Sequence, residues 1–175
     1  MKNPRAARSA WTGWTRGRIA LLPEDPGVPR DMTGYSHLWV FGAMMGMTKP
    51  AIEAALLKAR DALNLGDFWY RRFGENSRGQ KARIALARLL LMPEATVYIF
   101  DEPSNGLDFE SVSKVHAFIR GLDKEGKTVL VASHILSDLQ HLCDHMVGID
   151  QGKSASDDVL DAWLREHARN RAAAE

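Results

Sequence analysis

The feature that most constrains the fold is an apolar run that ends in two adjacent carboxylates. Residues 95–102 read ATVYIFDE, which is typical of a strand buried on both faces of a parallel sheet. Ligands of open α/β sheets bind at the carboxyl ends of the strands. There Asp101 can hold a magnesium ion, and Glu102 can orient or deprotonate a water molecule. Taken alone, the segment is equally typical of a strand that runs into an acidic turn.

Strands and helices are predicted to alternate from this strand onward, which indicates an α/β domain with a mainly parallel sheet. Downstream we expect a helix at 109–124, a strand buried on both faces at 128–132, a helix at 135–143, a strand at 145–150 and a helical tail at 157–174. Upstream we expect an irregular lead-in at 1–17, a strand at 18–22, helices at 35–47 and 49–63, and a helix that Ser77 begins and that ends before Pro93.

Composition limits the partners of the chain. The formal net charge of the 175 residues is +1, so no bulk attraction to nucleic acid or an anionic membrane is predicted. The longest apolar run, residues 37–47, is well short of the roughly 20 residues that a membrane-spanning helix needs. The basic N-terminus continues into polar residues, unlike a secretory signal. A role at a membrane would therefore need a docking partner, and Cys143 alone fits a reducing compartment.

Two further segments carry chemistry. Residues 76–80 (NSRGQ) precede the helix that leads to the carboxylate strand, and backbone N–H groups at a helix start can receive phosphate oxygens. A routine helix cap explains the same residues, since serine is a favoured N-cap. Downstream, Pro103 to Asp108 predicts a turn with an acidic end. His134 follows the strand at 128–132, where it can reach a γ-phosphate or serve as a structural residue.

Together these residues resemble the ABC ATPase family. Residues 76–111 resemble its signature motif, signature helix, Walker B strand and D-loop in unbroken succession. Ser133-His134 resembles the switch histidine, and Leu22-Pro23-Glu24 resembles the Q-loop. The resemblance covers roughly residues 18–153. The combination of Leu-Pro-Glu with Ser-Arg-Gly-Gln resembles the bacterial ABC-2-type exporter branch.

The resemblance implies a P-loop NTPase-like (RecA-like) fold with a mainly parallel sheet. It implies a partial ABC ATPase domain at 18–153, with an inserted helical subdomain at about 33–90, and a C-terminal helical tail at 154–175. The implied cofactors are ATP and Mg²⁺. The implied partners are a membrane-spanning permease subunit and a second ATPase subunit, in a homo- or heterodimer, with no nucleic acid. The implied location is the cytoplasmic face of the cell membrane, reached through the permease.

The resemblance also assigns roles to individual residues. It implies that Glu102 and His134 are catalytic, that Asp101 and Glu24 bind the metal, and that nucleotide contacts come from Ser77, Arg78, Gly79, Gln80 and Asp108. Two of these depart from the family pattern, because Glu24 replaces the usual glutamine and Arg78 replaces a glycine. A carboxylate can still coordinate magnesium, and Arg78 adds a cation near the phosphates.

The P-loop of the family, Gly-x-x-x-x-Gly-Lys-Ser/Thr, supplies the phosphate cradle and would lie N-terminal to residue 18. We expect the chain to lack this Walker A motif together with the P-loop strand. That strand is expected beside residues 95–100, which would then have an exposed apolar edge.

These expectations predict that the isolated chain is inactive and that it contributes the signature-side half of an ATP site against an intact partner. One alternative is a truncated or non-enzymatic regulatory or docking subunit of the same kind of transporter. Another is a soluble ABC ATPase of DNA repair or translation, which the neutral net charge and the lack of a coiled-coil insertion disfavour.

Overall fold

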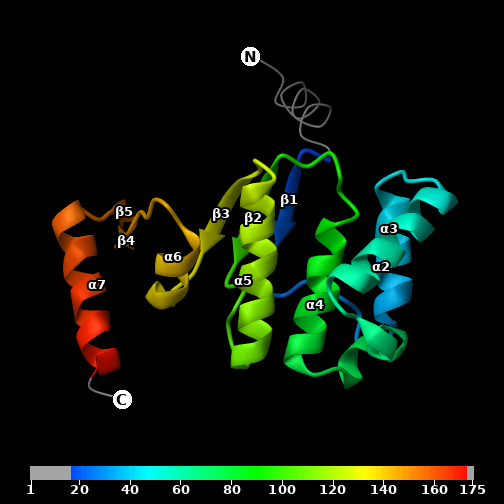
Figure 1. The fold of residues 1–175 in the computed structure, drawn as a ribbon, viewed down its shortest axis with the longest axis horizontal. Coiled ribbons are helices and arrows are strands. Elements are labelled where there is room, and N and C mark those ends of the chain that lie inside the picture. Colours follow the sequence, from blue (N-terminus) through cyan, green and yellow to red (C-terminus); the bar gives the residue numbers. More distant parts are fainter. Residues whose placement is uncertain (1–16, 173–175) are drawn as a thin grey trace, which may run out of the picture. The chain divides into compact units, whose positions relative to one another are not determined.

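The computed structural model describes residues 17–172, so nearly all of the predicted lead-in lies outside the described residues. Its centre is a three-stranded parallel sheet with the order β1-β2-β3 (Figure 1). The strands are β1 (Ile19–Leu22), β2 (Val97–Asp101) and β3 (Thr128–Ala132). The predicted α/β class with a parallel sheet is confirmed. By internal contacts the chain divides into two units, residues 1–132 and 133–175, and each is described by itself.

The first unit contains all three strands of this sheet and the helices that connect them. Between β1 and β2 lie α2 (Gly34–Met44), α3 (Lys49–Ala62), the 3-10 turns η1 (Gly66–Tyr70) and η2 (Phe73–Glu75), and α4 (Arg78–Leu89). Helix α5 (Phe109–Lys124) connects β2 to β3. The bounds predicted for α5 and β3 match the structure, and Ser77 does begin α4. The predicted domain boundaries remain a prediction.

The sheet is covered on one face. Helices α4 and α5 contact each other and pack on β1 and β3 respectively (Figure 1). Beneath them Tyr98 and Phe100 of β2 are buried, in register with Ala20 and Leu22 of β1. The alternate residues point to the other face, where Leu21 is 51% and Leu130 59% exposed. Within the first unit, the prediction that β2 and β3 are buried on both faces is therefore wrong.

The edge strands of the sheet also differ from the prediction. Strand β2 is the central strand, with β1 paired to one side and β3 to the other. The prediction that residues 95–100 form an exposed apolar edge is therefore wrong, because both hydrogen-bonding sides of that strand are occupied. In the part of the chain that the structure describes, β1 and β3 are the edge strands.

Helices α2, α3 and α4 form a layer beside the sheet (Figure 1). Two glycines of α2 allow this close packing. A Cβ atom at Gly34 would lie 2.8 Å from Cδ1 of Ile84 in α4, and one at Gly42 would lie 2.9 Å from Cγ1 of Ile52 in α3. Both isoleucines are fully buried. Because these two positions of α2 have no side chain, the three helices pack closely around one apolar core.

Arg88, in the last turn of α4, connects this helical layer to the loop after β1. Its Nη1 atom donates a hydrogen bond of 2.7 Å to the Pro26 carbonyl, and its guanidinium lies 4.8 Å from the ring centroid of Phe41 in α2. Burial lowers the pKa of Arg88 from its ordinary value. The pKa of the nearby His37 is lowered to about 4, mainly by burial and secondarily by the positive charge of Arg88.

The low pKa of His37 predicts acid sensitivity. Between about pH 4 and 6.5 the unfolded chain binds a proton at His37 that the folded chain does not, so stability falls as the pH falls through this window. We expect His37→Leu to reduce this loss by on the order of 1–2 kcal/mol, a value discounted for partial solvent screening. Urea unfolding of both proteins at pH 7 and pH 4.5 measures the difference. Equal losses in the two proteins would contradict the assignment.

The second unit contains α6 (Leu136–Leu142), a hairpin of β4 (Ile149–Asp150) and β5 (Lys153–Ser154), and α7 (Asp157–Ala172). The strand predicted at 145–150 is reduced to its last two residues. Gln151 and Gly152 both have positive φ, at 47° and 77°, as a two-residue hairpin turn requires. Among the helices of residues 17–172, none is both long and apolar enough to cross a membrane.

Candidate functional site

The carboxyl ends of β1 and β2 bring two of the predicted carboxylates to the same edge of the sheet. Asp101 is the last residue of β2, and Glu24 follows β1, the parallel neighbour of β2. The Glu24 Oε1 atom accepts a hydrogen bond of 3.1 Å from Nδ2 of Asn105. Glu24 is thereby connected to the turn that follows the Asp101-Glu102 pair.

Glu102 has an unusual backbone conformation. Its φ of 48° lies in the left-handed region, which costs a residue with a side chain about 1–2 kcal/mol. Its backbone N–H donates to the carbonyl of Ala132, at the end of β3, over 2.8 Å. Strained backbone of this kind is concentrated at functional sites. The carboxylate therefore stands at a sharp turn just beyond the central strand.

The turn that follows is held from three sides. The buried Ser104 hydroxyl lies 3.2 Å from Nε2 of His116 in α5. Arg78, at the start of α4, donates from Nη1 to the carbonyl of Gly106 over 3.4 Å. Together with the contact from Asn105 to Glu24, these bonds fix the turn relative to α4, α5 and the loop after β1.

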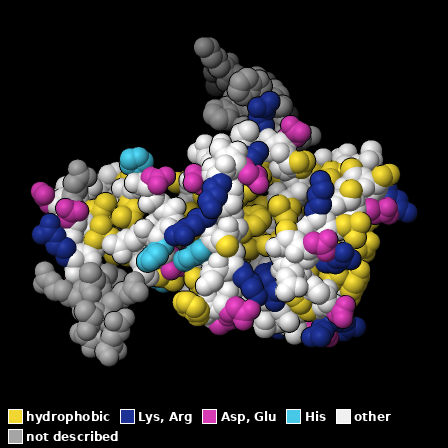
Figure 2. Space-filling model, viewed as in Figure 1, with side chains coloured by type: hydrophobic (Ala, Val, Ile, Leu, Met, Phe, Trp, Pro, Cys, Tyr) yellow, Lys and Arg dark blue, Asp and Glu magenta, His cyan; other side chains and the backbone are white. Residues whose placement is uncertain are grey.

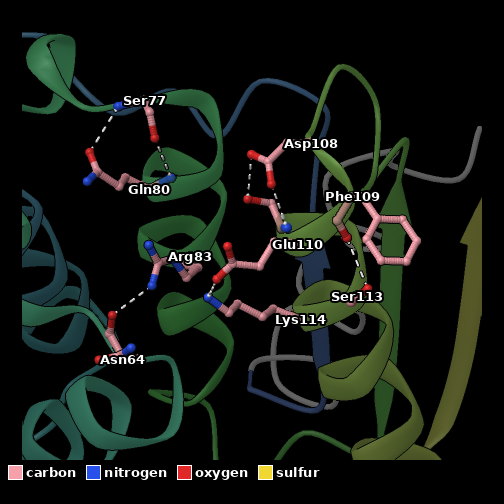
Figure 3. A network of polar contacts seen from close by, with 10 residues as sticks. Asn64, Ser77, Gln80, Arg83, Asp108, Phe109, Glu110, Ser113 and Lys114 are labelled. Atoms are coloured by element: carbon pink, nitrogen blue, oxygen red, sulfur yellow. Dashed lines mark hydrogen bonds and ion pairs between the residues drawn. The ribbon is translucent and has the colours of Figure 1, made fainter.

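The start of α4 is a complete capping box (Figure 3). The Ser77 hydroxyl oxygen accepts from the Gln80 backbone N–H at 3.2 Å, and Oε1 of Gln80 accepts from the Ser77 N–H at 3.0 Å. Both side chains thus have the structural role that the alternative interpretation gave them. The hydroxyl hydrogen of Ser77 can still donate, and the first N–H groups of a helix have no intrahelical acceptor. Ser77 and Arg78 are exposed, so both remain accessible to a phosphate.

Gly79 and Asp108 join the start of α4 to the start of α5. Asp108 caps α5, with Oδ1 accepting from the Ser111 N–H at 2.9 Å and Oδ2 from the Ser111 hydroxyl at 3.0 Å (Figure 3). These bonds, the backbone one first, lower the pKa of Asp108. A Cβ atom at Gly79 would lie 2.1 Å from Oγ of Ser111. Glycine is therefore required here for packing, whatever its relation to a nucleotide.

This contact predicts a stability effect at Gly79. We expect Gly79→Ala to destabilise the chain by about 1–3 kcal/mol, because overpacking exceeds the gain in helix propensity. Ser111→Gly removes the obstructing side chain. In a double-mutant cycle followed by urea unfolding, the two changes together should cost at least about 1 kcal/mol less than their sum. Additive costs would mean that Ser111 does not contact residue 79.

The predicted metal ligands, Glu24 and Asp101, lie at the ends of β1 and β2 in the first unit. No group of three or more His, Cys, Asp or Glu side chains within residues 17–172 is arranged to hold a metal ion. Mg²⁺ in phosphate-transfer sites uses one or two carboxylates together with phosphates and water. Glu24 and Asp101 fit that donor set. His134 belongs to the second unit, where its neighbour Ser133 accepts at Oγ from the Ile135 N–H over 3.1 Å, and its switch role stays a prediction.

The letters of a P-loop do occur in the chain, contrary to the expectation. Residues 121–128 read GLDKEGKT, which fits Gly-x-x-x-x-Gly-Lys-Thr. The structure places this segment at the C-terminal end of α5 and the start of β3. Gly126 has a φ of 72°, and Lys127 donates from Nζ to the Ala95 carbonyl over 3.0 Å. A P-loop connects a strand to a helix N-terminus, whereas this order presents helix carbonyls, so the segment is not a phosphate cradle.

Several residues of the site were not found from the sequence. Asn105, Ser111 and His116 each hold the turn or the helix starts. The spacing from Asp108 to Ser111 is the N-cap to N3 spacing, so that pair could have been recognised. The contacts of Asn105 and His116 depend on tertiary structure and have no local signal.

Comparisons with known proteins agree with the resemblance. Residues 3–105 match the family model described as ABC transporter. The ATP-binding protein NatA of Bacillus subtilis is 33% identical over 133 residues, which cover 76% of this chain and 54% of NatA. The Nod factor export ATP-binding protein I of Burkholderia lata is 30% identical over 161 residues, covering 92% and 51%. The lantibiotic transport ATP-binding protein SrtF of Streptococcus pyogenes is 29% identical over 143 residues, covering 82% and 60%. The chain spans about half the length of the curated relatives it matches.

Proposed function

The chain belongs to the ABC transporter family, and we propose that it is an ATP-binding subunit that contributes the signature side of an ATP site. In this proposal Ser77, Arg78, Gly79 and Gln80 face a nucleotide held on the P-loop of a second ATPase subunit, and Asp108 holds the adjoining helix start. The observation that carries the proposal is the exposed, capped start of α4, which is joined directly to the turn after the carboxylate pair.

The surroundings of α4 support a partner on this side. Phe109, the first residue of α5, directly follows Asp108 and is 89% exposed, so it is accessible to a partner at this helix start. Exposed aromatic side chains are enriched at the centres of protein interfaces. Arg78 adds a cation beside the free N–H groups of α4, which suits a polyphosphate.

The other predicted residues would serve a P-loop site on this chain's own sheet. We assign Mg²⁺ to Asp101 and Glu24, activation of water to Glu102, and contact with the γ-phosphate to His134. These roles require a P-loop strand and cradle in addition to β1, β2 and β3. In residues 17–172 the parallel sheet consists of β1, β2 and β3, and we therefore expect this chain, assayed alone, neither to bind ATP tightly nor to hydrolyse it.

The proposed partners are a membrane-spanning permease and a second ATPase subunit, and the proposed location is the cytoplasmic face of the membrane. The names of the relatives, which include Nod factor export and lantibiotic transport, support the proposal of an exporter, and the sequence resemblance suggests the ABC-2 type. Positive and negative side chains are interspersed on the face drawn in Figure 2. With a net charge of +1, this gives no nucleic-acid footprint.

The first test is ATP binding by the purified chain, with and without Mg²⁺, followed by titration with an ABC ATPase subunit that has a P-loop. The subunit used is NatA of B. subtilis, which is named as an ABC transporter ATP-binding protein, once its own ATP binding has been verified. We expect no tight binding by the chain alone and ATP-dependent association with NatA in sedimentation. ATPase activity of the isolated chain that Glu102→Gln abolishes would contradict the half-site. Association that is independent of ATP would favour the regulatory or docking subunit.

A further inference from the structure

Two of the predicted site residues depart from the family pattern, and the structure connects both of them to one turn. Arg78 stands where a glycine is usual, and its Nη1 atom donates to the Gly106 carbonyl over 3.4 Å. Glu24 stands where a glutamine is usual, and its Oε1 atom accepts from Nδ2 of Asn105 over 3.1 Å. We call residues 103–108 the clamped turn, because these two unusual side chains hold it at adjacent positions.

The side chain of Arg78 lies so close to Gly106 that no side chain fits at residue 106. A Cβ atom there would lie 1.9 Å from Nη1 and 3.0 Å from Cζ of Arg78. The φ of Gly106 is 67°, a conformation that glycine adopts freely and that asparagine also tolerates. Asparagine at residue 106 would therefore keep the backbone of the clamped turn and displace the guanidinium, which separates this contact from the fold of the turn.

The guanidinium of Arg78 can bind a second acceptor. It carries five N–H donors in a planar fork, and among residues 17–172 its hydrogen-bond acceptor is the Gly106 carbonyl. Arg78 is exposed and is the first residue of α4, directly after Ser77. Hydrogen bonds from arginine to phosphate oxygens are roughly twice as strong as neutral ones. A phosphate at the start of α4 can therefore bind Arg78 through its remaining donors while Nη1 keeps the carbonyl.

We propose that Arg78 is a positioning residue that connects a bound nucleotide to the clamped turn. The proposal rests on the signature-side role of α4 and deepens it: a phosphate at Ser77 orders the Arg78 side chain, and the ordered guanidinium fixes the Gly106 carbonyl. Because Asn105 is bonded to Glu24, the turn extends this order to the loop after β1. A chain of contacts is a coupling only if nucleotide changes the turn, so the test measures the turn directly.

Hydrogen exchange at the Leu107 amide reports on the clamped turn in the chain alone. This N–H donates to the Ser104 carbonyl over 3.2 Å. Arg78→Gly and Gly106→Asn should each lower the protection factor of the Leu107 amide at least about threefold, because each removes a hydrogen bond that holds the turn. In a chain that already carries Arg78→Gly, Gly106→Asn should add little. Unchanged protection in both single variants would overturn the proposal.

The same amide is then measured with ATP and NatA. In the unaltered chain the complex should raise the protection factor of Leu107 at least about tenfold. Gly106→Asn keeps the Arg78 charge, so it should still associate, with at most about threefold more ATP, but this rise in protection should be lost. Arg78→Lys keeps a charge that ends one bond short and has no planar fork, and it should lose the rise as well. A rise retained in both variants would overturn the proposal, because contact with NatA would then protect the turn without Arg78.

The outcomes separate this proposal from the signature-side role. ATP-dependent association without a rise in Leu107 protection would leave the signature-side role standing and overturn the connection through Arg78. Absence of ATP-dependent association would overturn both. Arg78→Gly should raise the ATP concentration for half-maximal association at least about tenfold, because a charge-assisted bond to phosphate is lost, and an unchanged concentration would mean that Arg78 does not bind phosphate. Melting curves confirm that each variant is folded.

Discussion

Ser77→Asp is expected to weaken ATP-dependent association with a P-loop subunit at least about 100-fold while leaving the chain as stable as before. Aspartate is as good an N-cap as serine, so the start of α4 should be retained. Its charge, however, would lie against the phosphates that the proposed site receives. Two unit charges about 4 Å apart near a protein surface repel by roughly 4 kcal/mol, which is ample for this loss. Sedimentation with NatA and ATP measures it.

Ser77→Asn is the matched control for this experiment. Asparagine also caps helices well and carries no charge, so association should fall far less than with aspartate. Equal behaviour of the two variants would mean that residue 77 does not face a phosphate. A fall in the melting temperature of Ser77→Asp would instead assign the loss to a broken cap.

Arg88→Ala is expected to destabilise the first unit by about 2–4 kcal/mol. The change removes a hydrogen bond from a charged donor to the Pro26 carbonyl, worth about 1.5–3 kcal/mol, and a cation–π contact with Phe41 worth about 0.5–2 kcal/mol. Removing the partly buried guanidinium also removes its desolvation cost, which offsets part of these two lost contributions. Urea unfolding at pH 7.5 measures the change. A loss below about 0.5 kcal/mol would mean that Arg88 is solvated.

Arg88→Met separates charge from packing. Methionine keeps the length of the side-chain stem, so the difference between the two variants reports lost apolar contact. Both should raise the pKa of His37, because the Arg88 charge is one of the causes of its low value. Pro26 lies just beyond Glu24, and we therefore expect both variants to loosen the loop that carries this carboxylate.

Local signals predicted the elements well. Ser77 is a favoured N-cap and predicts the start of α4 from neighbouring residues alone. Asp108 caps α5 in the same way and could have been recognised from its spacing to Ser111. The covering of the sheet was not predictable. An apolar run such as TVLVA is typical of a buried strand, and nothing in it shows whether the chain supplies the cover.

The site was predictable in its residue types more than in its contacts. The ends of β1 and β2 bring Glu24 and Asp101 to one edge, as parallel pairing requires. The strained φ of Glu102 and the bond from Asn105 to Glu24 arise from tertiary packing. Residues 121–128 show that a sequence match alone does not establish a site. They fit the P-loop consensus, but they lie between the end of a helix and the start of a strand.

The most direct test of the signature-side role is complementation of ATP hydrolysis. A NatA variant with a disabled signature motif is assayed alone and with increasing amounts of this chain. The proposal predicts that the chain restores ATP hydrolysis, that Ser77→Asp does not restore it, and that Glu102→Gln restores it as well as the unaltered chain. No restoration by folded chain, or restoration that depends on Glu102 but not on Ser77, would contradict the account.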